Sequence, residues 1–350
     1  YKYGDANIGD TVEFKITMTI PDYQGSWLSD KLHYNIKDSL TDGLTLDVSS
    51  IKLEGTSIND LFVANKKCTS TSITTSTSGF TLDLYGEDVY QYAGNTIAIT
   101  YQAQVNDKAK VNFDSDENKA TLKYSTVASG TDMSDPMQDI THHYTFGFDT
   151  LVNGTGSEKT TEITKYGVKT TTELDNKVAL DGAQFQLFDA NGKQLYFTSA
   201  GEYTTETSGT YDYIVSKNNG QLTATGLDAG TYTLKESKAP LGYALDKTTY
   251  TIVITPTYNE LTGELKNYTV RVSGATGNSI TFTHEKLDNG TINTTDNAAN
   301  ADTFGINNTP LITLPETGGA GMIVLTVAAV ILMAGFGTMF VSLRKRKQVK

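Results

Sequence analysis

Hydrophobic and polar residues alternate along most of this chain, which is the pattern of β-strands that bury one face. The segment "DTVEFKITMTIP" separates polar from apolar side chains, and its apolar face holds Val12, Phe14, Ile16, Met18 and Ile20. "NTIAITYQAQV" and "TYTIVITP" are further runs rich in β-branched and aromatic residues, and turn sequences such as "TDG", "ANG" and "LDAG" recur between runs. Because no long amphipathic helix pattern appears, we predict an all-β protein built from sandwiches.

The length of the chain predicts two tandem β-sandwich domains. Roughly 310 residues precede the C-terminal segment, which suits two domains of ordinary size. The polar stretch "LVNGTGSEKTTE" is rich in Gly, Ser and Thr, so we predict a linker over residues 151–162. The predicted domains are therefore residues 1–150 and residues 163–312.

The alternating pattern stops near the C-terminus. Residues 320–343 contain no charged side chain, and a helix of this length would measure about 36 Å, against a hydrocarbon core of roughly 30 Å. A basic tail follows over residues 344–350, which the positive-inside rule places in the cytoplasm. The sequence therefore predicts a single C-terminal transmembrane helix, with everything before Leu314 outside the membrane.

Charge and cysteine content agree with an exported protein. The formal net charge is −12, and the part before the tail, with 23 of the 28 basic residues and all 40 acidic residues, has a charge of −17. This argues against nucleic acid or an anionic lipid surface as a partner. Cys68 is the one cysteine, so no internal disulfide can form, and its polar surroundings indicate an incidental surface thiol. The chain opens without a Met inside a strand-like segment, so we expect a processed or truncated N-terminus.

Three strands of the second domain each place one polar side chain on an apolar face. In "GTYTLKE" this residue is Glu236, in "TFGINN" it is Asn308, and in "TEITK" it is Lys165. A buried carboxylate is costly unless it is protonated or tightly hydrogen-bonded. We expect the acid, the amide and the amine to point inward together; the alternative is three separate surface residues.

The first domain repeats this arrangement. "LHYNIKD" places Asp38 on an apolar face, and "ENKATLKY" does the same with Asn118. An acid and an amide are therefore predicted to enter this core as well.

The segment "LPETG" before the apolar span and the basic tail resembles the sorting signal of Gram-positive cell-wall-anchored proteins. The resemblance implies that a sortase cleaves between Thr and Gly and transfers the threonine acyl group to an amine on peptidoglycan or on another pilin. Cleavage by a sortase needs an extended segment, and the proline of this motif disfavours a helical conformation at the leucine that precedes it. The implied recognition and cleavage residues are Leu314, Pro315, Glu316, Thr317 and Gly318.

The second domain resembles the CnaB-type domains of Gram-positive pilins in "YTLKE", "APLGY" and "LDGAQFQLFD". The resemblance implies that Lys165 attacks Asn308 with the help of Glu236, forming an intramolecular isopeptide bond with loss of ammonia. Desolvation would favour the neutral amine and the protonated carboxyl. The family pattern places the lysine closer to the "LDGA" segment, so Lys169 remains an alternative.

The first domain resembles the isopeptide-forming fimbrial domain of major pilins in "IGDTVEFKITMTIPDY" and "YAGNTIAITYQA". Asp38 and Asn118 carry over directly as acid and amide. The family lysine lies shortly before "IGDTV", where Lys2 is the candidate; the alternative is a lysine upstream of Tyr1.

The resemblance implies a cell-wall-anchored pilus shaft subunit on the surface of a Gram-positive cell. Its implied partners are sortase, other pilin subunits, peptidoglycan and, in addition, host surface molecules, and no cofactor is expected. The alternative is a monomeric sortase-anchored adhesin that binds host matrix or glycan. A surface enzyme is disfavoured, because no nucleophile–base motif appears and the proposed bond formation is a single turnover.

Metal binding is not expected. His142 and His143 point to opposite faces of a strand, and we interpret His284 as a surface strand residue. "DSDENK" resembles a calcium loop, but Lys119 occupies the position where an EF-hand needs glycine.

Overall fold

The computed structural model describes residues 2–58, 60, 67–150, 161–168, 177–203, 210–274, 277–297 and 303–311. Nearly all regular structure in this part of the chain is β-strand, as the alternating pattern predicts. The two short helical segments with defined bounds are the 3-10 turn η1 (Gly25–Trp27) and the helix α2 (Glu87–Tyr90).

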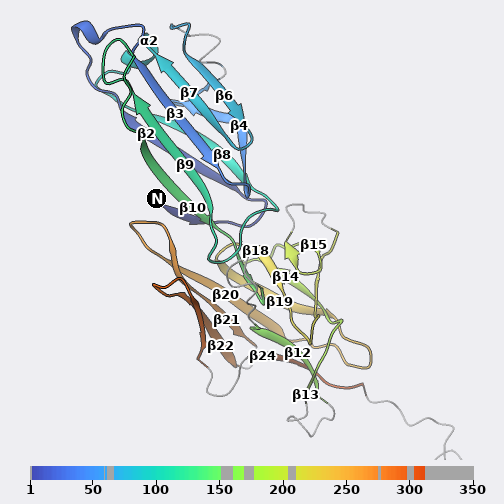
Figure 1. The fold of residues 1–350 in the computed structure, drawn as a ribbon. Helices are drawn as coiled ribbons and strands as arrows, with labels where there is room; N and C mark the ends of the chain where they lie inside the picture. Colours follow the sequence, from blue (N-terminus) through green and yellow to red (C-terminus); the bar gives the residue numbers. More distant parts are fainter. Residues whose placement is uncertain are drawn as a thin grey trace, which may run out of the picture. The chain divides into compact units, whose positions relative to one another are not determined.

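Two sheets form the first sandwich (Figure 1). One sheet has the order β1-β10-β9-β3-β7-β6, with bounds β1 Tyr3–Asp5, β10 Met137–Tyr144, β9 Asp116–Tyr124, β3 His33–Leu40, β7 Gly79–Tyr85 and β6 Ser72–Ser76. The other has the order β2-β8-β4-β5, with bounds β2 Thr11–Thr19, β8 Thr96–Val105, β4 Leu44–Leu53 and β5 Thr56–Ser57. Apolar side chains from both sheets fill the core between them.

In the first core, burial along the edge strand β2 follows the two-residue strand period only in part. In β2, Phe14 and Met18 are buried, whereas Val12 and Ile16 are only half-buried although they share the same face. β2 is an edge strand, so its apolar face is less completely covered by the opposite sheet.

The second sandwich is larger. Its main sheet has the order β17-β14-β19-β20-β21-β22-β23, with bounds β17 Ile214–Val215, β14 Gln184–Phe188, β19 Gly230–Lys238, β20 Thr249–Tyr258, β21 Leu265–Ser273, β22 Ser279–Lys286 and β23 Ile292–Asp296. A three-stranded sheet has the order β13-β12-β24, with bounds β13 Lys177–Ala179, β12 Ile163–Val168 and β24 Phe304–Asn308. Two strand pairs complete it: β11 Phe146–Phe148 with β18 Ala224–Leu227, and β15 Phe197–Ser199 with β16 Glu202–Tyr203.

A parallel pairing between β12 and β24 brings the two ends of the second domain together. Its register places Lys165 opposite Ile306 and Gly167 opposite Asn308. Residues in register on neighbouring strands point to the same face of a sheet. The lysine and the asparagine, far apart in sequence, therefore share one inward face.

The second core begins before the predicted linker of residues 151–162. Phe146 and Phe148 are fully buried in the second core, and β11 pairs with β18 of that sandwich. The predicted transmembrane helix at 320–343 and the tail at 344–350 lie outside the described residues. Among the residues that the structure does describe, no helix has the length and apolar composition needed to cross a bilayer.

Candidate functional site

Lys165, Glu236 and Asn308 meet inside the second sandwich. Lys165 is 0% exposed, Asn308 1% and Glu236 6%. Lysine and asparagine come from the parallel pair β12–β24, whereas the glutamate comes from β19 of the opposite sheet. The structure thus brings together the three residues that the alternating pattern turns inward.

The glutamate contacts both other members of this group. Its Oε1 lies 3.2 Å from Lys165 Nζ, and its Oε1 and Oε2 accept hydrogen bonds of 3.1 and 3.0 Å from Asn308 Nδ2. The same Nδ2 donates to the carbonyl of Ala244 at 2.8 Å, and Glu236 Oε2 accepts from the backbone N–H of Asp246 at 2.6 Å. The amide and the amine therefore flank a single carboxylate.

Burial also changes the state of the amine. Desolvation lowers the pKa of Lys165, although the negative charge of Glu236 counteracts this effect. The Nζ lies 5.6 Å from the centre of the Phe185 ring, so an apolar wall closes one side. A larger fraction of this amine is therefore in the neutral, nucleophilic form than in a solvated lysine.

Tyr243 covers the site, and sequence reasoning did not identify it as a site residue. A Cβ atom on Gly167, opposite Asn308 in register, would lie 2.4 Å from Cε1 of the Tyr243 ring. Only glycine leaves room for this ring over the lysine strand. The "APLGY" sequence that supported the family resemblance contains this tyrosine, and that motif was the available signal. The alternative lysine, Lys169, lies outside the described residues.

A different arrangement occupies the first sandwich. Asp38 and Asn118 are both buried, and the hydroxyl of Tyr101 lies between them. This hydroxyl donates to Asp38 Oδ2 at 2.6 Å and accepts from Asn118 Nδ2 at 2.7 Å. Burial raises the pKa of Asp38 to about 7, although the hydrogen bond from Tyr101 lowers it. Tyr101, which the sequence identifies only as a strand aromatic, is thus a third polar member of this group.

Lys2 is not in contact with this group. Its Nζ forms an ion pair with Asp139, and its side chain is 39% exposed. The backbone N–H of His142 donates to the Lys2 carbonyl, so Lys2 continues β1 along β10. Asp139 and Asn118 line the same cavity, of about 530 Å³, between β10 and the edge strand β2.

His284 is not the surface residue that its sequence context suggested. It is 0% exposed, and its Nε2 lies 2.9 Å from Oε1 of the buried Glu162. The hydroxyl of Thr294, on the neighbouring strand β23, lies 3.0 Å from His284 Nδ1, and the ring stacks on Tyr268 at 4.5 Å between centroids. The prediction was wrong because "SITFTHEK" places this histidine on the apolar face of its own strand.

Glu162 also forms a reciprocal contact with Asp149, which lies before the residues that are not described. Each carboxylate accepts the backbone N–H of the other residue, and Asp149 additionally accepts the N–H groups of Ile163 and Leu222. Burial and the charge of Glu162 raise the pKa of Asp149. Although burial opposes ionisation of Glu162, His284 holds the pKa of Glu162 below its usual value. These contacts fix the start of β12 at Ile163, two residues before Lys165.

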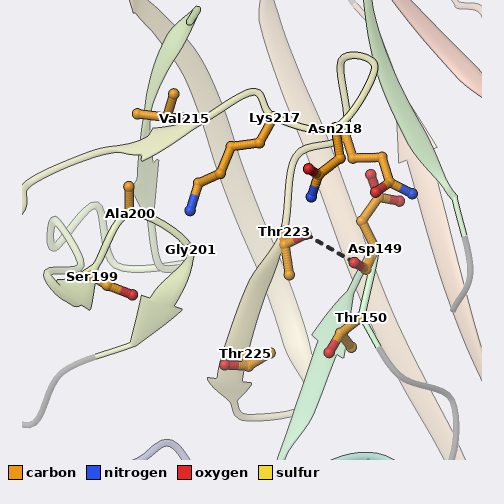
Figure 2. A pocket seen from close by; sticks show the side chains of 11 residues that line it. Asp149, Thr150, Ser199, Ala200, Gly201, Val215, Lys217, Asn218, Thr223 and Thr225 are labelled. Carbon is orange, nitrogen blue, oxygen red and sulfur yellow. Dashed lines mark hydrogen bonds between the residues drawn. The ribbon is translucent and has the colours of Figure 1, made fainter. Parts of the chain in front are cut away.

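A polar cavity of about 300 Å³ lies beside Asp149 (Figure 2). The Thr223 hydroxyl donates to the Asp149 carbonyl at 2.9 Å, and the Lys217 side chain extends towards Gly201. Its walls carry hydroxyl and amide groups and contain no aromatic side chain.

No metal site is evident in the part of the chain that is described, where no three His, Cys, Asp or Glu side chains are arranged around a common point. In the "DSDENK" segment, Asp116 is buried and accepts from the Thr41 hydroxyl and from two backbone N–H groups. The carboxylate oxygens of Asp116 therefore accept hydrogen bonds from within the fold. The predicted sorting segment, Leu314 to Gly318, lies outside the described residues.

Comparisons with known proteins recognise two parts of the chain. Residues 164–269 match the SpaA prealbumin-like fold domain, and residues 306–350 match the LPXTG cell wall anchor motif. The chain is 25% identical over 292 residues to the trypsin-resistant surface T6 protein of Streptococcus pyogenes, covering 80% of this chain and 46% of that protein. It therefore spans less than half the length of this curated relative.

Solved pilin structures are similar to most of the chain. The T6 backbone pilin of Streptococcus pyogenes is 18% identical with a TM-score of 0.49, covering 87% of this chain and 66% of that one. The pilus 2b backbone protein of group B streptococcus is 23% identical with a TM-score of 0.48, covering 89% of this chain and 96% of that one. The chain thus contains a SpaA prealbumin-like fold domain and an LPXTG cell wall anchor motif, and it is similar to the T6 protein of Streptococcus pyogenes over most of its length.

Proposed function

We propose that this chain is a structural subunit of a Gram-positive pilus shaft, stiffened by intramolecular Lys–Asn isopeptide bonds and joined to its neighbours by sortase. The observation that carries the proposal is the convergence of Lys165, Glu236 and Asn308 in a buried site, whose strand β24 ends six residues before Leu314. The anchor motif and the match to the T6 protein support the same role.

In the second sandwich the proposed reaction is a condensation. The neutral amine of Lys165 attacks Cγ of Asn308, a C–N bond forms, and the bond from Cγ to Nδ2 breaks. Glu236 takes the surplus proton from the lysine nitrogen and delivers it to Nδ2, which leaves as ammonia. Its contacts with both groups suit this transfer. The reaction occurs once per molecule, so the chain is not an enzyme.

In the first sandwich we propose the corresponding bond between Lys2 and Asn118. Thr141 of β10 is opposite Asn118, and Lys2 is the next residue back along β1 from the pair Tyr3–His142. Asp139, which holds the Lys2 amine, is then a diagonal neighbour of Asn118, at about 7–8 Å in an ordinary sheet. The amine reaches the amide by leaving Asp139 and entering the cavity between β10 and β2.

The proposed bond in the second sandwich lies on the load path of the shaft. Asn308 is six residues before Leu314, and sortase would join the chain to its neighbour through Thr317. Tension on that link enters the domain at β24, and a covalent bond to Lys165 passes it directly to β12. Partners in this role are sortase, other subunits and peptidoglycan.

Two measurements test the proposal. The intact mass should fall by about 17 Da, one ammonia, for each bond formed. Incubation with a pilin-polymerising sortase should give covalent multimers linked through Thr317, and Thr317→Ala should give none. Multimers absent from the parent chain, with anchoring to a peptidoglycan-like amine retained, would instead indicate a monomeric surface adhesin.

A further inference from the structure

The acid and the amide of the first sandwich are both bonded to a third polar group, the hydroxyl of Tyr101. Both lie on one sheet, where Asp38 pairs with Ala120 and Asn118 pairs with Leu40, so they are diagonal neighbours on β3 and β9. Side chains in this relation start about 7–8 Å apart. Burial raises the pKa of Asp38, while the hydrogen bond from Tyr101 and, to a smaller extent, a contact with Asn118 lower it.

Tyr101 bridges the two groups from the opposite sheet. It lies on β8, and its hydroxyl is within 2.6 Å of Asp38 Oδ2 and 2.7 Å of Asn118 Nδ2. The ring stacks on Phe14 at 5.3 Å and meets the edge of Phe80 at 5.2 Å, and Tyr101 is only 2% exposed. The aromatic contacts therefore hold the hydroxyl at a fixed point between acid and amide.

A tyrosine hydroxyl has one proton to donate and lone pairs to accept another, so it can pass a proton between two neighbours. Desolvation and the nearby carboxylate raise the pKa of Tyr101, which keeps the phenol protonated at rest. Asn118 Oδ1 and Asp38 Oδ1 are buried without a hydrogen-bond partner among the described residues. Each therefore retains an acceptor for use during the reaction.

We propose that Tyr101 is a catalytic residue of the first sandwich, relaying the proton between Asp38 and Asn118 during isopeptide formation. The inference rests on the proposed bond between Lys2 and Asn118. As the Lys2 nitrogen bonds to Cγ, its surplus proton passes to the Tyr101 oxygen while the phenol proton passes to Asp38. The same path in reverse delivers a proton to Nδ2, the bond from Cγ to Nδ2 breaks, and ammonia leaves. Asp38 and Tyr101 end in their starting states.

The test compares Tyr101→Phe with the parent in the full 350-residue chain. Phenylalanine keeps the ring contacts and removes only the hydroxyl. Intact mass at successive times after synthesis, with mapping of the cross-linked peptides, should show first-sandwich bond formation slowed by about 100-fold. The second-sandwich bond should form at the parent rate. The matched control is Tyr34→Phe, another buried tyrosine of this sandwich whose hydroxyl bonds Tyr23 at 2.6 Å.

A rescue variant separates catalysis from folding. Asp38→Glu combined with Tyr101→Phe gives the acid the reach that Glu236 has in the second sandwich, so bond formation should recover at least tenfold over Tyr101→Phe alone. If Tyr101→Phe forms the bond at the rate of Tyr34→Phe, the relay is wrong. A parent chain that never loses ammonia from the first sandwich also overturns it, and leaves the pilin proposal standing on Lys165 and Asn308.

Discussion

Each sandwich buries a carboxyl and an amide side chain, but these groups are arranged differently in the two. In the second, amine and amide share one sheet and Glu236 reaches across from the other to contact both. In the first, acid and amide share one sheet, and the residue that reaches across is Tyr101. Side-chain length and sheet of origin therefore determine which polar residue bridges the others, which is Glu236 in the second sandwich and Tyr101 in the first.

The two lysines differ as well. Lys165 lies in the core beside an aromatic ring, and burial lowers its pKa. Lys2 is partly exposed and paired with Asp139 at the sheet edge. In the second sandwich the amine and the amide thus already contact the acid, whereas the bond proposed for the first requires the Lys2 amine to move.

The largest effect should follow Glu236→Ala, which removes the acid that serves both reactants. We expect no second-sandwich ammonia loss and a stability decrease of about 5 kcal/mol, since the bond closes a very long loop. Unpaired buried Lys165 should add to this cost. Lys165→Met removes bond and charge together and should cost less. Denaturant unfolding and intact mass check these values, with the exposed Glu285→Ala as control; an unchanged mass loss in Glu236→Ala would contradict the assignment.

The pH dependence of stability should have opposite signs in the two sandwiches when the bonds are blocked. With Lys2→Ala, the raised pKa of Asp38, about 7 against 3.8 for an ordinary aspartate, means that the folded state keeps a proton that the unfolded chain releases. Stability of the first sandwich should therefore fall between pH 4 and 7, by at most about 4 kcal/mol. Trp27, the single tryptophan, packs on this core and reports its unfolding. Asp38→Asn should remove the slope.

With Asn308→Ala, the second sandwich should respond in the other direction. The pKa of Lys165 is lowered by burial, so the folded state releases a proton that the unfolded lysine keeps. Stability should rise as pH increases towards 10.5, the ordinary lysine value, as measured by hydrogen exchange in β12 and β24. A falling stability over this range would argue against a buried, destabilised ammonium.

Gly167→Ala should have a smaller effect on the second site. The added Cβ would meet the Tyr243 ring at 2.4 Å, so the ring must move off the lysine strand. We expect a loss of about 1–3 kcal/mol and slower bond formation. Gly305→Ala on β24 is the matched control, because its Cβ would have its closest contact at 3.2 Å, from the Tyr166 ring. Equal effects of the two substitutions would exclude a specific covering role for Tyr243.

The smallest effect should come from Asp139→Ala. The ion pair with Lys2 is exposed, and such pairs contribute about 0–1 kcal/mol. Trp27-detected unfolding should therefore change little, while mass spectrometry should show faster bond formation at Asn118 once the amine is released. A slower reaction would mean that Asp139 guides the amine rather than withholding it.

Strand period was sufficient to predict the all-β fold and the inward positions of Lys165 and of the acid and amide in each sandwich, whereas Lys2 is partly exposed. Glu236 shares its face with Tyr232 and Leu234, and all three are buried. The face on which a side chain lies can be read from the local sequence, because residues two apart on a strand point to the same face. The parallel pairing of β12 with β24, which makes two of these faces one site, depends on the whole domain.

The residues that sequence reasoning missed acquire their roles from distant partners. Tyr101 fits the pattern of a core aromatic, and its hydroxyl matters only because Asp38 and Asn118 arrive from the opposite sheet. His284 is buried by a contact with Glu162, far earlier in the chain. The alternation of residues along a strand predicts which way a side chain points. Its hydrogen-bond partner, however, depends on how the sheets pack against one another.

Intact mass with peptide mapping of the purified chain tests the central claim most directly. We predict a loss of about 17 Da at each site, with a cross-linked peptide joining Lys165 to Asn308 and a second joining Lys2 to Asn118. A chain of unchanged mass, in which Lys165 and Asn308 are recovered as separate unmodified residues, would contradict it.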